Sequence, residues 1–139
     1  MKVGDRFGAS SWTEIPQSRI DAFAEATGDH QWIHVDAERA AAGPFAPTIA
    51  HGYLTLSLLP AASYEVIPPQ GDAMAINYGL NRVRFPAPVP VGSRVRASFE
   101  AAAVEDADWG MQATLTGTVE REGGDKPVCV AEVVFRYYT

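Results

Sequence analysis

The stretch ATGDHQWIHVDAERAAAGPFAPTIAHGYLTLSLL, from Ala26 to Leu59, holds the residues around which the rest of the chain is organised. It contains Asp29, His34 and His51, and Gly52 opens the longest apolar run of the sequence. A carboxylate and an imidazole close together in a chain are suited to acid/base chemistry. A glycine at a helix start exposes backbone N–H groups that stabilise a negatively charged oxygen. The stretch therefore predicts an acid/base pair beside an oxyanion site.

The first helices are expected to fix the backbone around this pair. Apolar residues at helical spacing predict an amphipathic helix over residues 16–27. Gly28 is placed to end that helix in the left-handed conformation, so that Asp29 follows directly after the helix end. Asp36 is expected to cap a short helix over residues 37–42.

The apolar run itself predicts the central helix. Residues 49–66, IAHGYLTLSLLPAASYEV, are apolar on nearly every helical face, which indicates a buried helix rather than a surface helix. A helix of about sixteen residues is about 24 Å long. Pro60 is expected to kink or shorten it.

The second half of the chain predicts an antiparallel sheet. Residues 74–80 alternate at the period of a strand, and the alternation slips near Asn81, which a β-bulge explains. Alternation also predicts strands over residues 94–103 and 111–120. Residues 128–138 are apolar on both faces, which is typical of a strand inside a sheet. A helical first half and a β second half predict an α+β fold in which the central helix lies across the sheet.

Composition limits the classes of protein to which the chain can belong. Its 139 residues fit one domain, taken as residues 1–139, and 47% hydrophobic with 20% charged residues predicts a packed core. A net charge of −6 without a basic run argues against nucleic acid as a partner. No apolar run is long enough to span a bilayer, so no membrane partner is expected. Cys129 is the only cysteine, which predicts a small buried strand residue and a cytoplasmic location without disulfides.

Two separated motifs carry a resemblance to a known family. The first is Thr27-Gly28-Asp29 followed by Ile33-His34-Val35-Asp36, and the second is Ala50-His51-Gly52-Tyr53-Leu54. The stretch Arg-Phe-Pro-Ala-Pro-Val at residues 84–89 adds to the likeness. On these residues the chain resembles the MaoC-like (R)-specific enoyl-CoA hydratase family, in its nodulation-protein-N-like branch, over nearly the whole sequence.

The resemblance implies a fold, an assembly and an activity. The fold is the hot-dog fold, an antiparallel sheet wrapped around a long helix, and the assembly is a homodimer. The activity is the addition of water to a trans-2-enoyl-CoA, which gives a (3R)-3-hydroxyacyl-CoA with acyl-CoA as the substrate and no cofactor. Asp29 and His34 are implied to hold and activate the water, with the backbone N–H of Gly52 in the oxyanion hole.

Further residues are expected to contact the substrate. Many members of the family have Asn-Pro shortly after the aspartate, whereas this chain has Gln31-Trp32, so Gln31 is expected to supply the amide. His51 is expected to be structural or to form part of the pocket wall, and Tyr53 is expected in that wall. Arg84 is a candidate for binding CoA phosphates, as are Arg82, Arg94 and Arg96, and a solvated strand face is the alternative for each of them.

Simpler roles stay open for some of these residues. Asp29 can cap the next turn, and Gly52 can serve only the close packing of the helix against the sheet. His30 and His34 are spaced as metal ligands on a helix, but the adjacent Gly28 argues against one helix that carries both. No metal is therefore expected.

Two other functions are alternatives to the hydratase. A thioesterase of the same fold commonly carries an acidic residue on or near the central helix, and residues 50–64 contain none. A non-catalytic binding module for acyl thioesters is the second alternative. The intact pair of Asp29 and His34 argues against it.

Overall fold

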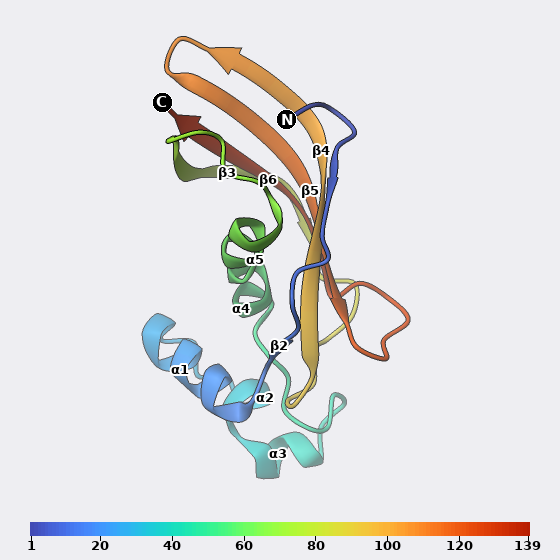
Figure 1. The fold of residues 1–139 in the computed structure, drawn as a ribbon. Helices are drawn as coiled ribbons and strands as arrows, with labels where there is room; N and C mark the ends of the chain where they lie inside the picture. The colour runs from blue at the N-terminus through green and yellow to red at the C-terminus, as the bar shows by residue number, and fades with distance from the viewer.

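The computed structural model describes all residues from 1 to 139 and shows helices in the first half of the chain and long strands in the second (Figure 1). The helices are α1 (Gln17–Thr27), α2 (Trp32–Val35), α3 (Ala37–Ala41), α4 (Gly52–Ser57) and α5 (Leu59–Val66). The strands are β1 (Arg6–Phe7), β2 (Thr13–Glu14), β3 (Met74–Arg84), β4 (Arg94–Ala107), β5 (Gly110–Arg121) and β6 (Cys129–Tyr138). This division confirms the predicted α+β class.

The strands form one antiparallel sheet in the order β1-β4-β5-β6-β3, with β2 also paired to β4. Strand β6 lies between β5 and β3, as its apolar character on both faces predicted. Strand β3 is an edge strand, so its outer row of backbone groups has no partner strand within the protomer. Its register against β6 shifts between Leu80 and Val83, which confirms the bulge predicted near Asn81.

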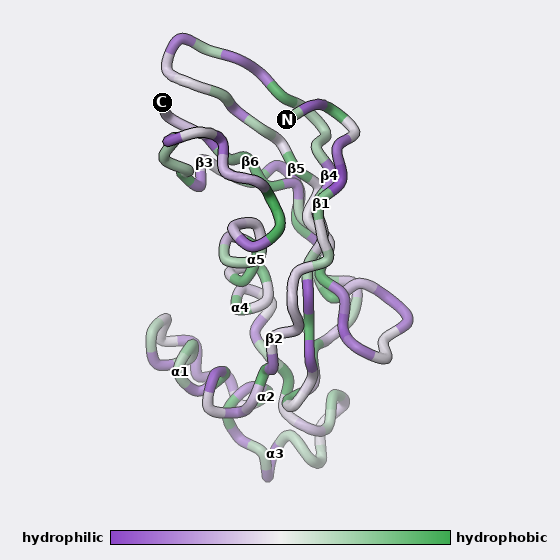
Figure 2. Tube along the Cα trace, viewed as in Figure 1, coloured by the Kyte–Doolittle hydropathy of each residue, from purple (hydrophilic) through white to green (hydrophobic).

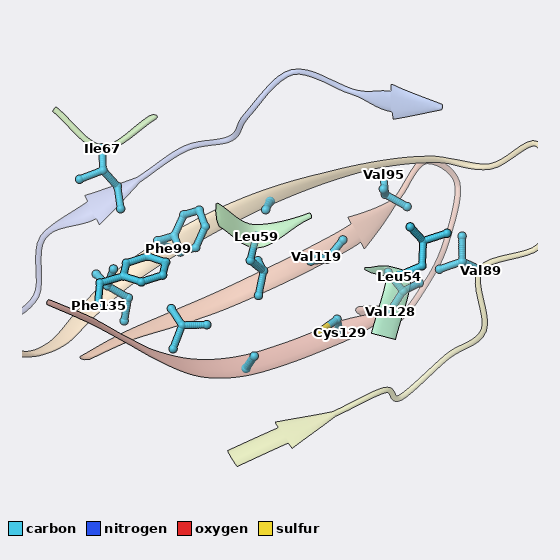
Figure 3. Close-up of a cluster of buried hydrophobic side chains, with 14 of the residues drawn as sticks. Leu54, Leu59, Ile67, Val89, Val95, Phe99, Val119, Val128, Cys129 and Phe135 are labelled. Carbon is cyan, nitrogen blue, oxygen red and sulfur yellow. The ribbon is translucent and has the colours of Figure 1, made fainter. Parts of the chain in front are cut away.

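Helices α4 and α5 lie against one face of the sheet, and their contact forms the core (Figure 1). Leu59 is fully buried and lies over the middle of the sheet, between a group around Phe99 and Phe135 and a group around Leu54 and Val128 (Figure 3). A Cβ atom added to Gly117 would lie 3.1 Å from the Leu59 side chain, so a glycine in β5 permits this close approach. The arrangement is the hot-dog fold.

The central helix differs from the single buried helix predicted over residues 49–66. It begins at Gly52 and consists of α4 and α5, which are separated at Leu58. Pro60 lies in the first turn of α5 and cannot donate a backbone hydrogen bond across the break. The helix is also not buried on every face, since Tyr53 and Tyr64 are 72% and 68% exposed. The sheet covers only one side of the helix in the protomer.

Hydropathy follows this layering along the chain (Figure 2). Hydrophilic and hydrophobic residues alternate along the strands, and the loop between β5 and β6 is largely hydrophilic. Cys129 is fully buried in β6, as predicted, and burial raises the pKa of its thiol to about 11. None of the helices is both long and apolar enough to cross a lipid bilayer.

Candidate active site

Asp29 lies in a turn that is fixed on both sides. Helix α1 ends at Thr27, and Gly28 has a φ of 81° while its N–H donates to the Ala24 carbonyl, which confirms the predicted left-handed helix end. The N–H of Asp29 donates to the Thr27 hydroxyl at 3.3 Å, and the Asp29 carboxylate accepts from the Gln31 N–H at 3.3 Å. The carboxylate thus caps the next turn, yet the residue stays exposed and available to solvent.

His34 lies on α2 with one ring nitrogen engaged and the other free. The side chain is buried, and its Nδ1 atom lies 2.8 Å from the carbonyl oxygen of Ile49. A carbonyl oxygen only accepts, so Nδ1 carries the proton and Nε2 is left as a proton acceptor. Burial lowers the pKa of His34 below its ordinary value of 6.5, and nearby His51 lowers it further. The Ile49 hydrogen bond and the charge of Asp29 raise this pKa but do not reverse the shift.

The ring of His51 stacks on the ring of His34. His51 is 2% exposed, and the two rings have a centroid separation of 3.9 Å and an interplanar angle of 24°. The Nε2 atom of His51 lies 2.9 Å from the carbonyl oxygen of Asp29. The ring of Phe23, from α1, covers His51 at a centroid separation of 4.9 Å. One atom each of Asp29, His34 and His51, a carboxylate oxygen and two ring nitrogens, lie within 4.8 Å of one another.

A pocket of about 380 Å³ opens beside His34 and the first turn of α4. Apolar and small residues form most of its wall, which consists of His34, Phe45, Ile49, Ala50, Gly52, Thr55, Phe85, Pro86, Ala87, Pro88, Val89 and Val128. Gly52 is the first residue of α4, a position whose backbone N–H has no acceptor within the helix. A Cβ atom on Gly52 would lie 3.1 Å from the Phe85 ring, so the glycine also allows this ring to lie close.

The other residues expected to contact substrate lie at different distances from this pocket. Gln31 is exposed at the start of α2, and Tyr53 is exposed on α4, outside the pocket wall. Arg84 ends β3 directly before Phe85, which lines the pocket. Arg94 instead forms an ion pair with Glu122, and Arg96 forms one with Glu120, on the outside of the sheet. Both arginines also lie over the Trp12 ring.

Sequence reasoning missed several residues of the pocket wall. Phe45 and the segment 85–89 reach the pocket from loops, and no local periodicity places them there. Thr55 is buried and lies one helical turn after Gly52, on the same face of α4. That spacing is the signal that identifies it.

The cluster of Asp29, His34 and His51 is also a candidate for metal binding by composition. Ligand nitrogens must point at one ion from about 2.0 Å. The two imidazole rings are nearly parallel, so the lone pairs in their planes run side by side instead of converging. His34 Nδ1 and His51 Nε2 are already bonded to carbonyl oxygens. The geometry favours acid/base chemistry over a metal centre.

Comparison with known proteins identifies the family. The model described as the MaoC-like domain matches residues 1–133. The chain is similar to 3-hydroxyacyl-thioester dehydratase Z of Mycobacterium tuberculosis, with 59% identity over 136 residues that cover 97% of this chain and 90% of that protein. Nodulation protein N of Rhizobium leguminosarum bv. viciae is 46% identical over 133 residues, which cover 94% of this chain and 83% of that protein.

A solved structure supports the same assignment. An (R)-hydratase from A. caviae involved in PHA biosynthesis matches the fold with a TM-score of 0.81 and 29% identity, covering 98% of this chain and 96% of that chain. The two motifs at residues 27–36 and 50–54 contribute residues to one pocket, and His51 of the second motif contacts Asp29 of the first. The chain belongs to the MaoC-like family of hydratases and dehydratases and is a hydro-lyase.

Proposed function

We propose that this enzyme adds water to trans-2-enoyl-CoA thioesters to give (3R)-3-hydroxyacyl-CoA, and removes water in the reverse direction. The observation that carries the proposal is that a carboxylate oxygen of Asp29 lies within 4.8 Å of a ring nitrogen of His34, and that His34 lines a pocket together with Gly52, the first residue of α4. The 59% identity of this chain to 3-hydroxyacyl-thioester dehydratase Z of Mycobacterium tuberculosis adds support. The reaction needs no cofactor because the thioester itself activates the double bond.

The acid/base step follows from the protonation of the two side chains. The His34 Nε2 atom accepts a hydrogen bond from water, and its lowered pKa keeps it unprotonated at neutral pH. The Asp29 carboxylate accepts a hydrogen bond from the other hydrogen of the same water. As the water oxygen bonds to the β-carbon, one of its O–H bonds breaks and that proton moves to the pair, while the other hydrogen stays on the new hydroxyl. The π electrons move toward the α-carbon and the thioester oxygen, and the pair then delivers the proton to the α-carbon.

Negative charge develops on the thioester oxygen during this step. In this proposal the backbone N–H of Gly52, the first residue of α4, and the positive end of the helix stabilise that charge, as in an oxyanion hole. The small side chain at position 52 lets the thioester approach the backbone. Phe85, whose ring lies against Gly52, forms the apolar wall beside it.

CoA is the carrier that the surroundings of the pocket favour. Arg84 is exposed at the end of β3, directly before pocket residue Phe85, and makes no ion pair. A guanidinium at such a place can bind a phosphate through two parallel hydrogen bonds. Gln31 lies in the turn after Asp29, where its backbone N–H donates to the Asp29 carboxylate, and its side-chain amide is the group proposed to contact the substrate.

A thioesterase of this fold commonly has a carboxylate on or near the central helix. The carboxylate next along this helix is Glu65, and it binds the backbone N–H and the hydroxyl of Ser11 at 2.6 and 3.0 Å. Glu65 does not line the pocket beside His34. This engagement of Glu65 with Ser11 favours the hydratase.

The proposed assembly is a homodimer in the cytoplasm, formed at the edge strand β3. Eleven residues of β3 have an unpaired edge, and four large apolar side chains along it are exposed, namely Met74, Ile76, Tyr78 and Leu80. A long exposed edge with apolar side chains is a site of pairing with another chain. A two-fold pairing of β3 with its copy would make one continuous sheet.

One assay series separates the three functions. Purified protein is given crotonyl-CoA and longer enoyl-CoAs, while the enoyl chromophore and free thiol are followed together. A hydratase removes the chromophore without releasing thiol, and chiral analysis gives the 3R product. Release of thiol would establish the thioesterase, and binding without turnover would establish the binding module.

A further inference from the structure

His51 is buried where three parts of the proposed site meet. Its Nε2 atom is 2.9 Å from the carbonyl oxygen of Asp29, and its ring stacks on that of His34. The residue that follows it, Gly52, begins α4. One side chain thus contacts the backbone of the proposed carboxylate and the ring of the proposed imidazole. The same residue is joined covalently to the proposed oxyanion donor.

The hydrogen bond to Asp29 selects one tautomer of His51. The Nδ1 atom is buried and has no hydrogen-bond partner, whereas Nε2 faces a carbonyl oxygen that only accepts. The ring proton is therefore on Nε2, and this N–H donates a hydrogen bond to the backbone carbonyl oxygen of Asp29. Because the Asp29 N–H donates to Thr27, the peptide groups on both sides of Asp29 are held.

His51 is also the N-cap of α4, yet its side chain makes no capping hydrogen bond. Serine, threonine, aspartate or asparagine at an N-cap accepts a hydrogen bond from a backbone N–H of the first turn. The imidazole instead reaches away from the helix to Asp29, so no side-chain cap occupies the first turn.

We propose that His51 is a positioning residue that fixes where the Asp29 turn and the His34 ring lie relative to the first turn of α4. The inference rests on the proposed hydration at that pair. His51 does not line the pocket and touches no reacting atom, so it acts through Asp29 and His34. Misplacement of catalytic groups by about 1 Å can reduce the rate about 100-fold.

Three substitutions separate the parts of this role. His51→Gln places an amide N–H near the position of Nε2 and restores the bond to Asp29. His51→Asn carries the same amide one methylene shorter, so it ends near the position of Nδ1 and can cap α4 instead. His51→Phe keeps a ring against His34 but has no donor.

The expected order of kcat is wild type, then Gln, with Asn and Phe about 100-fold below wild type. KM should change little in all three because His51 makes no substrate contact. His30→Gln is the matched histidine control, since His30 is exposed and lies 3.8 Å from Glu25. Its kcat should equal that of wild type.

A second measurement uses the wild-type protein and needs no turnover. Nitrogen-15 NMR of the imidazoles should give the Nε2–H tautomer for His51, with a proton protected from exchange. The amides of the Asp29 turn should exchange slowly in wild type and in His51→Gln, and faster in His51→Asn and His51→Phe.

Several outcomes would overturn the proposal. Equal kcat for His51→Phe and His51→Gln would mean that the donor to Asp29 is not needed. Equal kcat for His51→Asn and His51→Gln would mean that the length of the side chain, and hence its reach to Asp29, has no effect. An Nδ1–H tautomer in wild type would overturn it even if a variant fails to fold. Should wild type hydrate no enoyl thioester, the proposed function fails by itself. The tautomer and the exchange rates of the Asp29 turn then still decide whether His51 positions that turn.

Discussion

The Nδ1 atom of His34 lies 2.8 Å from the carbonyl oxygen of Ile49, the residue two positions before His51. This bond connects His34 of the first motif to the residue directly before the second motif, and it fixes the His34 tautomer. It leaves Nε2 as the nitrogen that can exchange a proton with water. Protonation of Nε2 is disfavoured because the ring is buried and faces a second imidazole.

The first prediction is the pH dependence of activity. Protonation of His34 removes the acceptor for water, so kcat/KM should fall as the pH is lowered. Since the pKa of His34 is lowered from 6.5, the fall should be centred below pH 6.5. Asp29→Asn removes a negative charge that raises this pKa, so His34 should titrate at still lower pH in that variant. NMR titration of His34 checks both, and a midpoint above 6.5 would contradict the assignment.

The second prediction concerns Asp29 and His34 as a unit. Asp29→Asn and His34→Ala should each reduce kcat by about 100- to 10,000-fold, the usual contribution of general acid/base groups. If both act on one water, the double variant should be little worse than the poorer single variant. KM should move little because neither residue is proposed to hold CoA.

Folding is the control for this pair. Asp29 is exposed, so the melting temperature of Asp29→Asn should stay near that of wild type. His34 is buried, so His34→Gln is a useful companion to His34→Ala. Retention of more than about half of kcat by Asp29→Asn would leave Asp29 only its capping bond to Gln31.

The third prediction separates the two roles of Gly52. A Cβ in Gly52→Ala would lie 3.1 Å from the Phe85 ring, which is half-exposed and can move, so the protein should fold. Activity should fall by up to about 100-fold because the pocket is narrowed beside the oxyanion donor. Phe85→Leu provides space for the new methyl group. Full recovery in the double variant would mean that Gly52 serves packing alone.

Much of the fold could be predicted because its signals are local. Gly28 ends α1, Asp36 caps α3 by accepting from the Arg39 N–H, and the bulge lies near Asn81. Each of these depends on a few neighbouring residues. The break at Leu58 was only partly predictable, because Pro60 indicated that the helix would be interrupted but not at which residue.

The arrangement of the site depended on contacts between distant segments. The two motifs named Asp29, His34 and Gly52, but the stacking of His34 on His51 and the bond of His51 to Asp29 arise only when α2 meets α4. Likewise, nothing local to Phe85 indicates that its ring lies against Gly52. Such contacts are set by packing of the whole chain rather than by periodicity.

The fourth prediction tests the homodimer. Leu80→Lys places a charge among the exposed apolar side chains of β3, where it should disfavour pairing of two edges. Light scattering at micromolar concentration should give a dimer for wild type and a smaller mass for the variant. The matched control is Val3→Lys, an exposed apolar residue that lies outside the strands. A wild-type monomer with full activity would contradict the proposed assembly.

The last prediction concerns the arginines and CoA. Arg84 ends β3 beside the pocket residue Phe85 and has no carboxylate partner, so Arg84→Ala should raise KM for an enoyl-CoA about tenfold with kcat nearly unchanged. A phosphate contact is made in the ground state and the transition state alike, which is why KM alone should respond. Arg94→Ala and Arg96→Ala are matched controls, because these residues pair with Glu122 and Glu120 on the outside of the sheet. High salt should reduce the difference between wild type and Arg84→Ala. An unchanged KM in Arg84→Ala would place the phosphate contact elsewhere.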